Sequence, residues 1–482
     1  MKSVEIDYKL DKIHEECGVF GFYKNDDDLD IVSITHDALY GLQHRGQESV
    51  GMTIIDNQQA YTCKDLGIIS TVFNHKNLSK LPNGVISVGH VRYTSSDYLD
   101  RAATQPLVMR YIEGSMALAN NGSITNFPEI RNRLEQGGSI FQSNSHAEII
   151  GFLIATNMIN SDTIEDAILS TMNDLKGAYS MVISSPSKLI GLRDPHGFKP
   201  LCIGKLKNSY MISSESCAIE SIGGTFIRDI EPGEMVVIDS DGFHSYHSKV
   251  KKKTSLCLFE YVYLARPDSV IDGVDVNVAR KKAGEILYRE NPVRADIVCG
   301  VPDSGLTAAQ GYSAASGIEY ATAFIKNKYI GRTPAALGND KKERLLNMRL
   351  NVLKNVVDGK RVVIIDDSIV RGNTSAHIVK ILRQAGAKEV HMRISSPEFK
   401  HACYFGVDLP EGDDFICNQY SVKELNKKIG ADSLAFLSVE GLHQIAEGCK
   451  IGLCDGCFTG DYHADKPKMK FEDKFSKKIN EL

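Results

Sequence analysis

The sequence predicts two unlike domains in one chain, an α+β domain followed by an α/β domain with a parallel sheet. Up to about residue 245, short strand patterns lie between turns, with a few helical patterns among them. After residue 255, short apolar runs alternate with longer helical patterns, which is typical of a parallel sheet covered by helices. The polar run 244–254, which contains three consecutive lysines, is predicted to be the linker.

Composition and charge exclude several classes of protein. The 482 residues are enough for two or three domains, and 42% hydrophobic with 24% charged residues is ordinary for a globular protein. A net charge of -5 gives no basic footprint for nucleic acid, and no apolar run is long enough to span a bilayer. Since the first sixteen residues lack a secretory pattern, we expect a cytoplasmic protein without nucleic-acid or membrane partners.

The first half contains the patterns of a mixed α+β domain. Strands are predicted at residues 18–22, 50–55, 85–91, 115–119 and 179–184, with a strand pair at 230–238. Helices are predicted at 31–42 and 147–157.

In the second half, predicted strands alternate with predicted helices. A strand at 297–301 precedes a helix at 306–316, and a strand at 362–365 precedes a helix at 374–385, with another strand at 390–394. Gly386 is placed as a helix stop. Ligands of parallel sheets bind at the carboxyl ends of the strands, where two polar loops fall, at 302–305 and 366–375.

The longer loop carries the chemistry of a phosphate site. Residues 362–375 read VVIIDDSIVRGNTS, so two carboxylates, Asp366 and Asp367, follow a buried strand and suit Mg²⁺ or ribose hydroxyls. Gly372 lets the backbone approach a ligand, and Thr374 and Ser375 stand at a helix start, where free N–H groups favour phosphate. A capped strand–turn–helix with a solvated acidic pair is the alternative, which the combined pattern disfavours.

This segment resembles the phosphoribosyl-diphosphate loop of type I phosphoribosyltransferases. The resemblance implies that Asp366 and Asp367 contact the ribose and Mg²⁺, and that the following residues hold the 5-phosphate. Those residues are Ser368, Val370, Arg371, Gly372, Asn373, Thr374 and Ser375. VPDSG at 301–305 looks like the family's diphosphate loop, with Ser304 near the metal, and KNKYIGRT at 326–333 looks like its mobile loop, with Lys326 and Arg332 as substrate ligands.

Cys17 opens the strand-like run CGVFG. A small buried cysteine is the commoner reading of such a residue. With QHRGQES at 43–49, GHVRY at 89–93 and NNGSITN at 120–126, however, the first half resembles a class II glutamine amidotransferase domain, a four-layer αββα N-terminal-nucleophile hydrolase. Over residues 15–460 the chain resembles the glutamine phosphoribosyldiphosphate amidotransferase family, which catalyses the first committed step of purine synthesis.

The resemblance implies roles for four groups in the first half. A leader is cut before Cys17, whose freed α-amino group can then accept the thiol proton. Asn121 and the Gly122 amide form an oxyanion hole. Arg92 pairs with the α-carboxylate of glutamine, and Arg45 supports the pocket.

The implied organisation has four parts. They are a leader at 1–16, an amidotransferase domain at 17–245, a phosphoribosyltransferase domain at 255–450 and a C-terminal segment at 451–482. The family also implies glutamine and phosphoribosyl diphosphate as substrates, inhibition by purine nucleotides, and a homotetramer.

The eleven cysteines are an odd, scattered set, which argues against a disulfide framework. CDGC at 454–457 could serve zinc, redox chemistry or neither. Its context resembles the iron–sulfur branch of the family, which implies a [4Fe–4S] cluster on Cys257, Cys403, Cys454 and Cys457. Spacing alone does not distinguish this cluster from structural zinc.

Several positions depart from the family pattern. His146 stands where the family has the aspartate that holds the α-ammonium of glutamine, Asp97 replaces a glycine, and Asn120 stands where the family has a histidine. Beyond the mobile loop, Pro334, Leu346-Asn347 and Arg349 also differ. Two alternatives follow: a diverged paralogue that uses ammonia or another amide donor, and a non-catalytic regulator that binds phosphoribosyl diphosphate.

Overall fold

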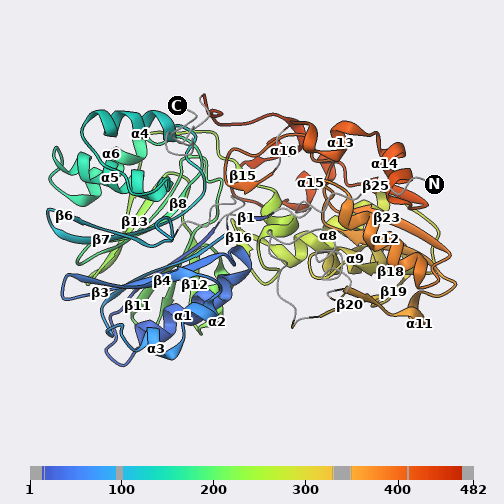
Figure 1. Ribbon diagram of the computed structural model, residues 1–482, viewed down its shortest axis with the longest axis horizontal. Helices are drawn as coiled ribbons and strands as arrows, with labels where there is room; N and C mark the ends of the chain where they lie inside the picture. Colours follow the sequence, from blue (N-terminus) through green and yellow to red (C-terminus); the bar gives the residue numbers. More distant parts are fainter. Residues whose placement is uncertain are drawn as a thin grey trace, which may run out of the picture.

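The computed structural model describes residues 14–15, 17–93, 101–327, 329, 348, 350–409 and 412–468. Figure 1 shows two domains, the first in blue to green and the second in yellow to red. No helix within these ranges is long and apolar enough to cross a membrane.

The first domain is built on two stacked antiparallel sheets. One has the strand order β12-β10-β11-β2-β5-β3-β4, and the other has the order β14-β13-β9-β8-β7-β6. The strands of the first sheet are β2 (Cys17–Tyr23), β3 (Ser49–Asp56), β4 (Gln59–Leu66), β5 (Ile86–Arg92), β10 (Cys202–Leu206), β11 (Ser209–Ser213) and β12 (Thr225–Asp229). Those of the second are β6 (Leu107–Tyr111), β7 (Gly114–Asn121), β8 (Ser180–Ser184), β9 (Leu189–Arg193), β13 (Glu234–Asp239) and β14 (Gly242–His247).

Helices cover the outer face of each sheet, which completes four layers. On the first sheet these are α1 (Ile31–Leu42) and α7 (Ser216–Ser221), and on the second they are α4 (Phe127–Gln136), α5 (His146–Met158) and α6 (Ile164–Asp174). All seven residues of β2 are buried, because Phe20 and Phe22 face α1 while Val19 and Tyr23 face the other sheet. The αββα prediction is therefore confirmed.

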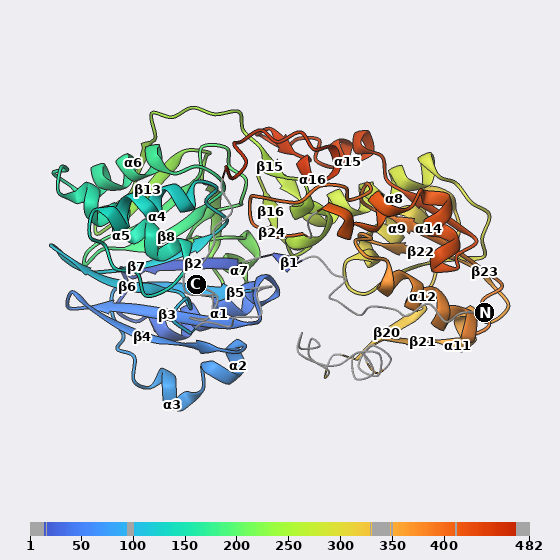
Figure 2. The same ribbon diagram turned by 45° about the horizontal axis from the view of Figure 1, so that its top comes forward.

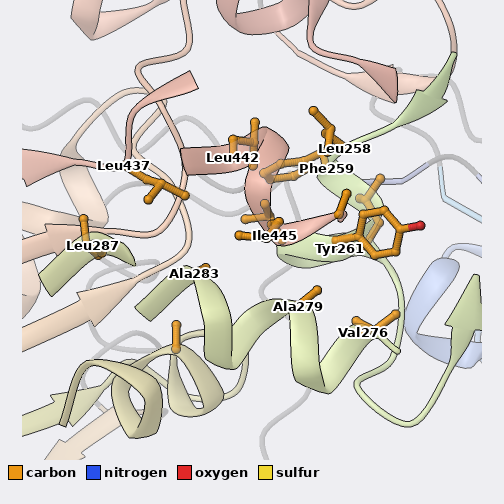
Figure 3. Close-up of a cluster of buried hydrophobic side chains, with 14 of the residues drawn as sticks. Leu258, Phe259, Tyr261, Val276, Ala279, Ala283, Leu287, Leu437, Leu442 and Ile445 are labelled. Atoms are coloured by element: carbon orange, nitrogen blue, oxygen red, sulfur yellow. The ribbon is translucent and has the colours of Figure 1, made fainter. Parts of the chain in front are cut away.

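The second domain has a five-stranded parallel sheet in the order β19-β18-β22-β23-β25. The strands are β18 (Ile297–Gly300), β19 (Glu319–Tyr320), β22 (Arg361–Asp366), β23 (Glu389–Ile394) and β25 (Ser433–Phe436). Helices α8 (Val276–Glu290), α9 (Gly305–Ser316) and α15 (Val439–Ile445) pack on one face, and α12 (Asn373–Gln384) and α14 (Val422–Ile429) pack on the other. Figure 3 shows the first of these cores, where Ala279, Ala283 and Leu287 of α8 face Leu442 and Ile445.

Short elements complete the chain. The paired ones are β1 (His14–Glu15) with β24 (Val407–Asp408), β15 (Leu256–Cys257) with β26 (Leu453–Cys454), β16 (Val270–Ile271) with β17 (Val274–Asp275), and β20 (Phe324–Lys326) with β21 (Leu350–Val352). The helical ones are α2 (Ile69–Val72), α3 (His75–Leu78), α11 (Lys354–Val357), α13 (Ile416–Gln419), α16 (Gly456–Thr459), two 3₁₀ turns (Gln43–Arg45 and Gly412–Asp414) and a π-helix (Glu260–Leu264).

Two predictions near the end of the first domain are wrong in detail. Residues 230–238 contain one strand, β13, and not a pair, because Gly233 adopts a left-handed turn conformation with φ 77° before it. The first four residues of the predicted linker, 244–247, belong to β14, which pairs with β13. The exposed, polar side chains of this edge strand hide it from a hydrophobicity pattern.

Buried polar contacts join the two domains. Arg193 of β9 is fully buried and its Nη2 donates to Asp272 Oδ2 at 2.7 Å. Lys199 Nζ donates to the carbonyl of Gly406 at 2.6 Å, and the Cys257 amide donates to the carbonyl of Phe198 at 3.2 Å. Figure 2 shows β15 and α16 lying between the domains, as they do in Figure 1.

Candidate active sites and cysteine cluster

The predicted nucleophile and its partners lie at one end of the stacked sheets. Cys17 opens β2, is only 6% exposed, and pairs in register with Arg92, the last residue of β5. Asn121 is the last residue of β7. A contact of 3.2 Å between His90 Nε2 and the carbonyl of Asn120 links the two sheets beside it.

The side chain of Asn121 is arranged for a ligand. It is fully buried, and neither Nδ2 nor Oδ1 has a hydrogen-bond partner among the described residues. Leaving such a group unpaired costs about 1–3 kcal/mol, so its position calls for a polar partner from outside the described residues. Gly122 beside it has φ 125°, and a Cβ there would meet the carbonyl oxygen of Ala178 at 2.4 Å, so this position requires glycine.

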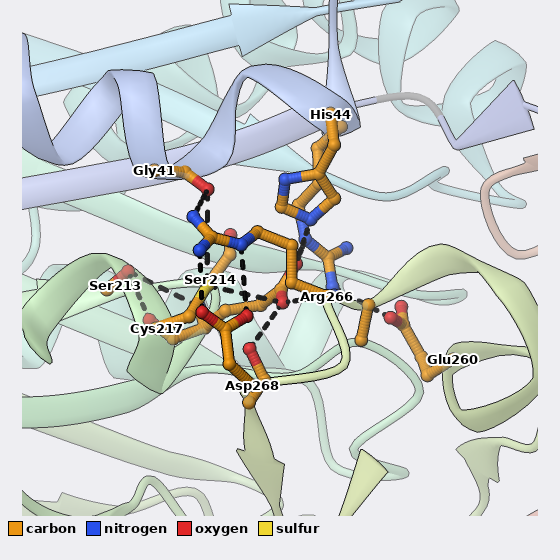
Figure 4. Close-up of polar contacts among 12 residues, drawn as sticks. Gly41, His44, Ser213, Ser214, Cys217, Glu260, Arg266 and Asp268 are labelled. Carbon is orange, nitrogen blue, oxygen red and sulfur yellow. Dashed lines mark hydrogen bonds and ion pairs between the residues drawn. The ribbon is translucent and has the colours of Figure 1, made fainter. Parts of the chain in front are cut away.

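Arg45 lies behind the nucleophile strand, in an ion network shared by both domains. Its guanidinium is fully buried, contacts Glu215, and donates from Nη2 to Glu260 Oε2 at 2.8 Å. His44 Nε2 lies 2.6 Å from Glu215 Oε1, and the Arg266 amide donates to Glu215 Oε2 at 2.8 Å. Figure 4 shows how the network joins His44, Arg266 and Glu260.

Sequence reasoning missed Glu215 and Glu260, which hold this network. Burial alone would raise the pKa of Glu215, but the charge of Arg45 and the contact with His44 outweigh it and hold the pKa well below its usual range. Only the segments SSESC and CLFEYVY contain these residues, and neither spacing signals a buried carboxylate.

The two predicted loops of the second domain meet, because β18 and β22 are neighbours in the parallel sheet. Asp366 ends β22, and both Asp366 and Asp367 are at most 5% exposed. The Ser304 hydroxyl of the shorter loop donates to Asp367 Oδ2, and Ser368 Oγ donates to Asp367 Oδ1 at 2.5 Å. A Cβ on Gly305 would meet the carbonyl oxygen of Ile365 at 2.3 Å, so glycine permits this close approach.

The rest of the longer loop leads into helix α12. Gly372 has φ 82° and precedes Asn373, the first residue of the helix, while Thr374 and Ser375 lie in its first turn. Val370 differs from its neighbours: its side chain is buried in the core, so only its backbone can face a ligand, and its carbonyl accepts from the Ile416 amide at 2.9 Å. The guanidinium of Arg371 lies 3.8 Å from Asp414.

Part of the predicted mobile loop is described. Lys326 ends β20 and forms an ion pair with Asp303 of the shorter loop. Arg332, Pro334, Leu346-Asn347 and Arg349 lie outside the described residues, as do Asp97 and the leader apart from residues 14–15.

The four predicted cluster cysteines line one cavity. Cys257, Cys403, Cys454 and Cys457 surround it together with aromatic and aliphatic side chains such as Phe405. Burial raises the pKa of the Cys454 thiol to about 12, and the other three sulfurs are near enough to add to the rise at Cys457. Four thiols converging in an apolar cavity fit an iron–sulfur or zinc site, although no three His, Cys, Asp or Glu side chains in the described ranges already stand in a metal-holding arrangement.

His146 is the first residue of α5 and is neutral. Burial, aided by the charge of Arg92, lowers its pKa to about 4. Its Nδ1 accepts a hydrogen bond of 3.1 Å from the Ile124 amide, and its ring lies on Phe127 with 4.4 Å between centroids. The departure noted in the sequence is therefore a neutral imidazole that is held by the amide of Ile124, three residues after Asn121 in the loop that follows β7.

Two family models match the chain. A model described as a glutamine amidotransferase domain matches residues 90–221, a range that includes Arg92, Asn121 and Gly122. A model described as a phosphoribosyl transferase domain matches residues 277–424, a range that includes Asp366 and Asp367.

Curated relatives and solved structures match nearly the whole chain. The amidophosphoribosyltransferase of Bacillus subtilis is 42% identical over 93% of this chain and 94% of that protein, and that of Archaeoglobus fulgidus is 41% identical over 95% and 100%. The solved glutamine phosphoribosylpyrophosphate amidotransferase of B. subtilis, complexed with ADP and GMP, has a TM-score of 0.85 at 42% identity and covers 93% of this chain and 98% of that one. A structure described as the allosteric regulatory enzyme of purine biosynthesis has a TM-score of 0.88 at 41% identity, with 96% and 100% covered.

Proposed function

The chain belongs to the amidophosphoribosyltransferase family, and from this premise we propose how its residues divide the work. The enzyme makes 5-phosphoribosylamine from phosphoribosyl diphosphate and ammonia derived from glutamine, the first step of purine synthesis. The observation that supports the proposed division is the fully buried amide of Asn121, which has no hydrogen-bond partner among the described residues and ends β7, in the sheet stacked on the one that contains β2 and Cys17.

The amide half of the reaction is assigned to the first domain, residues 17–245. Removal of a leader, residues 1–16, would free the α-amino group of Cys17 to accept the thiol proton. The thiolate attacks the side-chain amide of glutamine, and the Asn121 side chain and the Gly122 amide stabilise the oxyanion that forms. Arg92 binds the α-carboxylate, and Arg45 holds the nucleophile strand from behind through Glu215 and Glu260.

The acceptor half is assigned to the second domain, residues 255–450. Asp366 and Asp367 bind the ribose hydroxyls, and the loop from Ser368 to Ser375 holds the 5-phosphate at the start of α12. Ser304 and the acidic pair would hold Mg²⁺, which supplies positive charge to the leaving diphosphate. Ammonia attacks C1 of the ribose, with Lys326 and Arg332 as further substrate ligands.

The cysteine cavity is assigned a structural role. Cys257 precedes the π-helix, Cys403 lies before β24, and Cys454 and Cys457 belong to the segment after residue 450. A [4Fe–4S] cluster on these four thiolates would tie the C-terminal segment, 451–482, to the second domain. Zinc on the same ligands is the alternative, and the metal content of the purified protein separates the two.

Inhibition, cellular location and oligomeric state are inferred from the relatives and from the family. Because the B. subtilis neighbour is described in complex with ADP and GMP, we expect purine nucleotides to bind and inhibit this chain at the phosphoribosyl site. A cytoplasmic location and a homotetramer follow from the family resemblance. Intact mass and equilibrium sedimentation would report leader removal and the oligomeric state.

The decisive assay compares two nitrogen donors. Diphosphate release from phosphoribosyl diphosphate is measured with glutamine and, separately, with ammonia. The proposed function predicts activity with both. Activity with ammonia alone would indicate a diverged paralogue, and inactivity with both would indicate a non-catalytic regulator.

A further inference from the structure

A large pocket opens over His146. Its volume is about 720 Å³, and its wall comes from both domains. The first domain contributes residues 123–125, 127–128 and 146, next to Gly122, and the second contributes residues around Lys400 and Lys466. The wall begins one residue after Gly122 and includes His146, whose ring is near enough to Arg92 to be affected by its charge, so the pocket lies beside the residues assigned to the amide donor.

The wall of this pocket is positively charged. Its lysines are Lys400, which also pairs with Glu398 at 3.0 Å, Lys466 and Lys468, and none of its described residues is an aspartate or a glutamate. Lys466 Nζ lies over the ring of Tyr462, 4.4 Å from the centroid. The amino-terminal end of α5, a helix of thirteen residues, points its partial positive charge to the same place.

His146 contributes a hydrogen-bond donor to the pocket wall and carries no negative charge. Because Nδ1 accepts from the Ile124 amide, the neutral ring carries its proton on Nε2. No hydrogen bond from Nε2 to the described residues is found, so this N–H is available to an acceptor on a ligand.

Among the described residues, which do not include 94–100, the nearby carboxylates are engaged or set back from the wall. Glu148 accepts from the amides of Gln142 and Ser143, both at 2.8 Å, and from Ser143 Oγ at 2.7 Å. Glu129 has one buried oxygen without a partner, but it does not belong to the pocket wall. An ammonium group in this pocket would thus meet positive charges and a donor, and a carboxylate would meet complementary groups.

We propose that this site recognises its donor by the amide and the carboxylate and gains little from an α-ammonium group, so that ω-amides of dicarboxylic acids lacking the amino group serve as donors beside glutamine. Glutaramate is the simplest of them. His146 is the residue that sets this specificity. The proposal rests on the proposed role of Cys17 as the nucleophile.

The chemical step is the same for both donors. The thiolate of Cys17 bonds to the amide carbon, the C–N bond breaks, and the nitrogen leaves as ammonia after taking a proton from the Cys17 ammonium. Water then cleaves the thioester and releases glutarate from glutaramate, as it releases glutamate from glutamine.

The test compares kcat/KM for glutaramate and glutamine in the leaderless enzyme with phosphoribosyl diphosphate present. We expect the two values to agree within about tenfold, whereas a site built around an ion pair to the ammonium rejects the analogue by about 10⁴. His146→Asp, which supplies a carboxylate, should shift the ratio at least about tenfold toward glutamine. Glu129→Gln is the matched control and should leave the ratio unchanged.

Several results would overturn the proposal. They are a wild-type preference for glutamine above about tenfold, an unchanged ratio in a folded His146→Asp protein, or a shift in Glu129→Gln. If His146→Asp does not fold, as judged by circular dichroism, the wild-type ratio decides. Ammonia-dependent activity is measured in every sample: its survival with loss of both amides would overturn the nucleophile assignment itself, and its loss would overturn the acceptor assignment.

Discussion

At the scale of single residues, the two sites prepare for their ligands in different ways. In the first, the buried Asn121 amide has no partner among the described residues, so binding of the proposed oxyanion would remove an existing cost. In the second, Asp367 is already held by the hydroxyls of Ser304 and Ser368, so its carboxylate is oriented before a ligand arrives. The first site thus has a buried amide that lacks a hydrogen bond, and the second has a carboxylate that is already oriented.

Replacing the nucleophile should separate the two half-reactions. In Cys17→Ala the thiol that attacks the amide is gone, while the acceptor loop is untouched. Glutamine-dependent diphosphate release should fall by at least about 10³-fold, and ammonia-dependent release should stay within about twofold of wild type. Equal loss with both donors would rule out this division of labour.

Neutralising one carboxylate of the acidic pair should impair the reaction with both donors. Asp367→Asn keeps the shape of the side chain but removes the charge that the ribose and Mg²⁺ require. Release with both donors should drop together, by about 10²-fold or more, because they share one acceptor. Steady-state assays with each donor check this, and full activity with either one would count against the assignment.

Two buried histidines make stability depend on pH. Burial lowers the pKa of His90 to about 3 and that of His146 to about 4, so both are neutral in the folded state, while the unfolded chain takes up protons near pH 6.5. Their contribution is complete above about pH 6.5 and is lost as pH falls toward the folded values. The free energy of unfolding should fall by about 1.4 kcal/mol per pH unit for each histidine in this range.

Chemical denaturation at about pH 7 and about pH 5 must compare a variant with the wild type, because burial raises the pKa of Asp194 and of Asp229 to about 6 and these two groups oppose the histidines in this range. His146→Gln should reduce the difference between the two conditions, because one of the two titrating groups is removed. An identical difference in the variant and the wild type would show that His146 does not titrate as its burial implies.

Residue-level prediction from the sequence depended on local motifs. Cys17, Asn121 and the acidic pair stand in continuous segments, so their neighbourhood could be inferred without a fold. Glu215 and Glu260 could not be found in that way, since each becomes important only when Arg45, 170 and 215 residues away in sequence, reaches both of them. Val370 shows the converse: its place in the loop was apparent, but its burial in the core was not.

At the scale of elements, the π-helix Glu260–Leu264 links the ion network behind the nucleophile strand to helix α8 of the second domain. Glu260 pairs with Arg45 behind the nucleophile strand. Arg280 of α8 donates from Nε to the carbonyl of Tyr261 at 2.9 Å and from Nη2 to that of Ala265 at 2.7 Å. A π-helix is rare and often occurs at functional sites, and here it lies between the ion network of one domain and the core of the other.

Breaking the Arg45–Glu260 pair should destabilise the protein markedly. Both side chains are fully buried, so Glu260→Gln leaves a buried charge with one carboxylate fewer, at a cost of about 3 kcal/mol. The matched control is Glu447→Gln, whose pair with Lys282 is exposed to solvent and should contribute little to stability. Denaturant titration of both variants measures the contrast, and similar midpoints would contradict the role given to the pair.

The elements of the second domain were the most predictable part of the fold. Val298 and Val363 face one layer of helices while Ile297 and Val362 face the other, so each strand is apolar throughout and stands out from its surroundings. Strand β14 was missed because it is an edge strand with exposed polar side chains, a pattern that also describes a linker. Hydrophobicity thus identifies central strands and misplaces edges.

At the scale of the whole molecule, the domains are held by contacts that no local pattern reveals. The buried pair of Arg193 and Asp272 and the contact of Lys199 with Gly406 tie the first domain to the second. The cysteine cavity lies at the same junction, with Phe198 of the first domain in its wall. Such a joint would keep the nucleophile and the acceptor loop in fixed relation while ammonia passes between them.

The central claim is that nitrogen released at Cys17 reaches the site of Asp366 and Asp367 inside one chain. Glutamine labelled with ¹⁵N at the amide is supplied with phosphoribosyl diphosphate and an excess of unlabelled ammonium near neutral pH. The isotope in the trapped phosphoribosylamine is then measured. Internal transfer predicts that most of the product carries ¹⁵N; product whose label matches the diluted pool in solution would contradict the account.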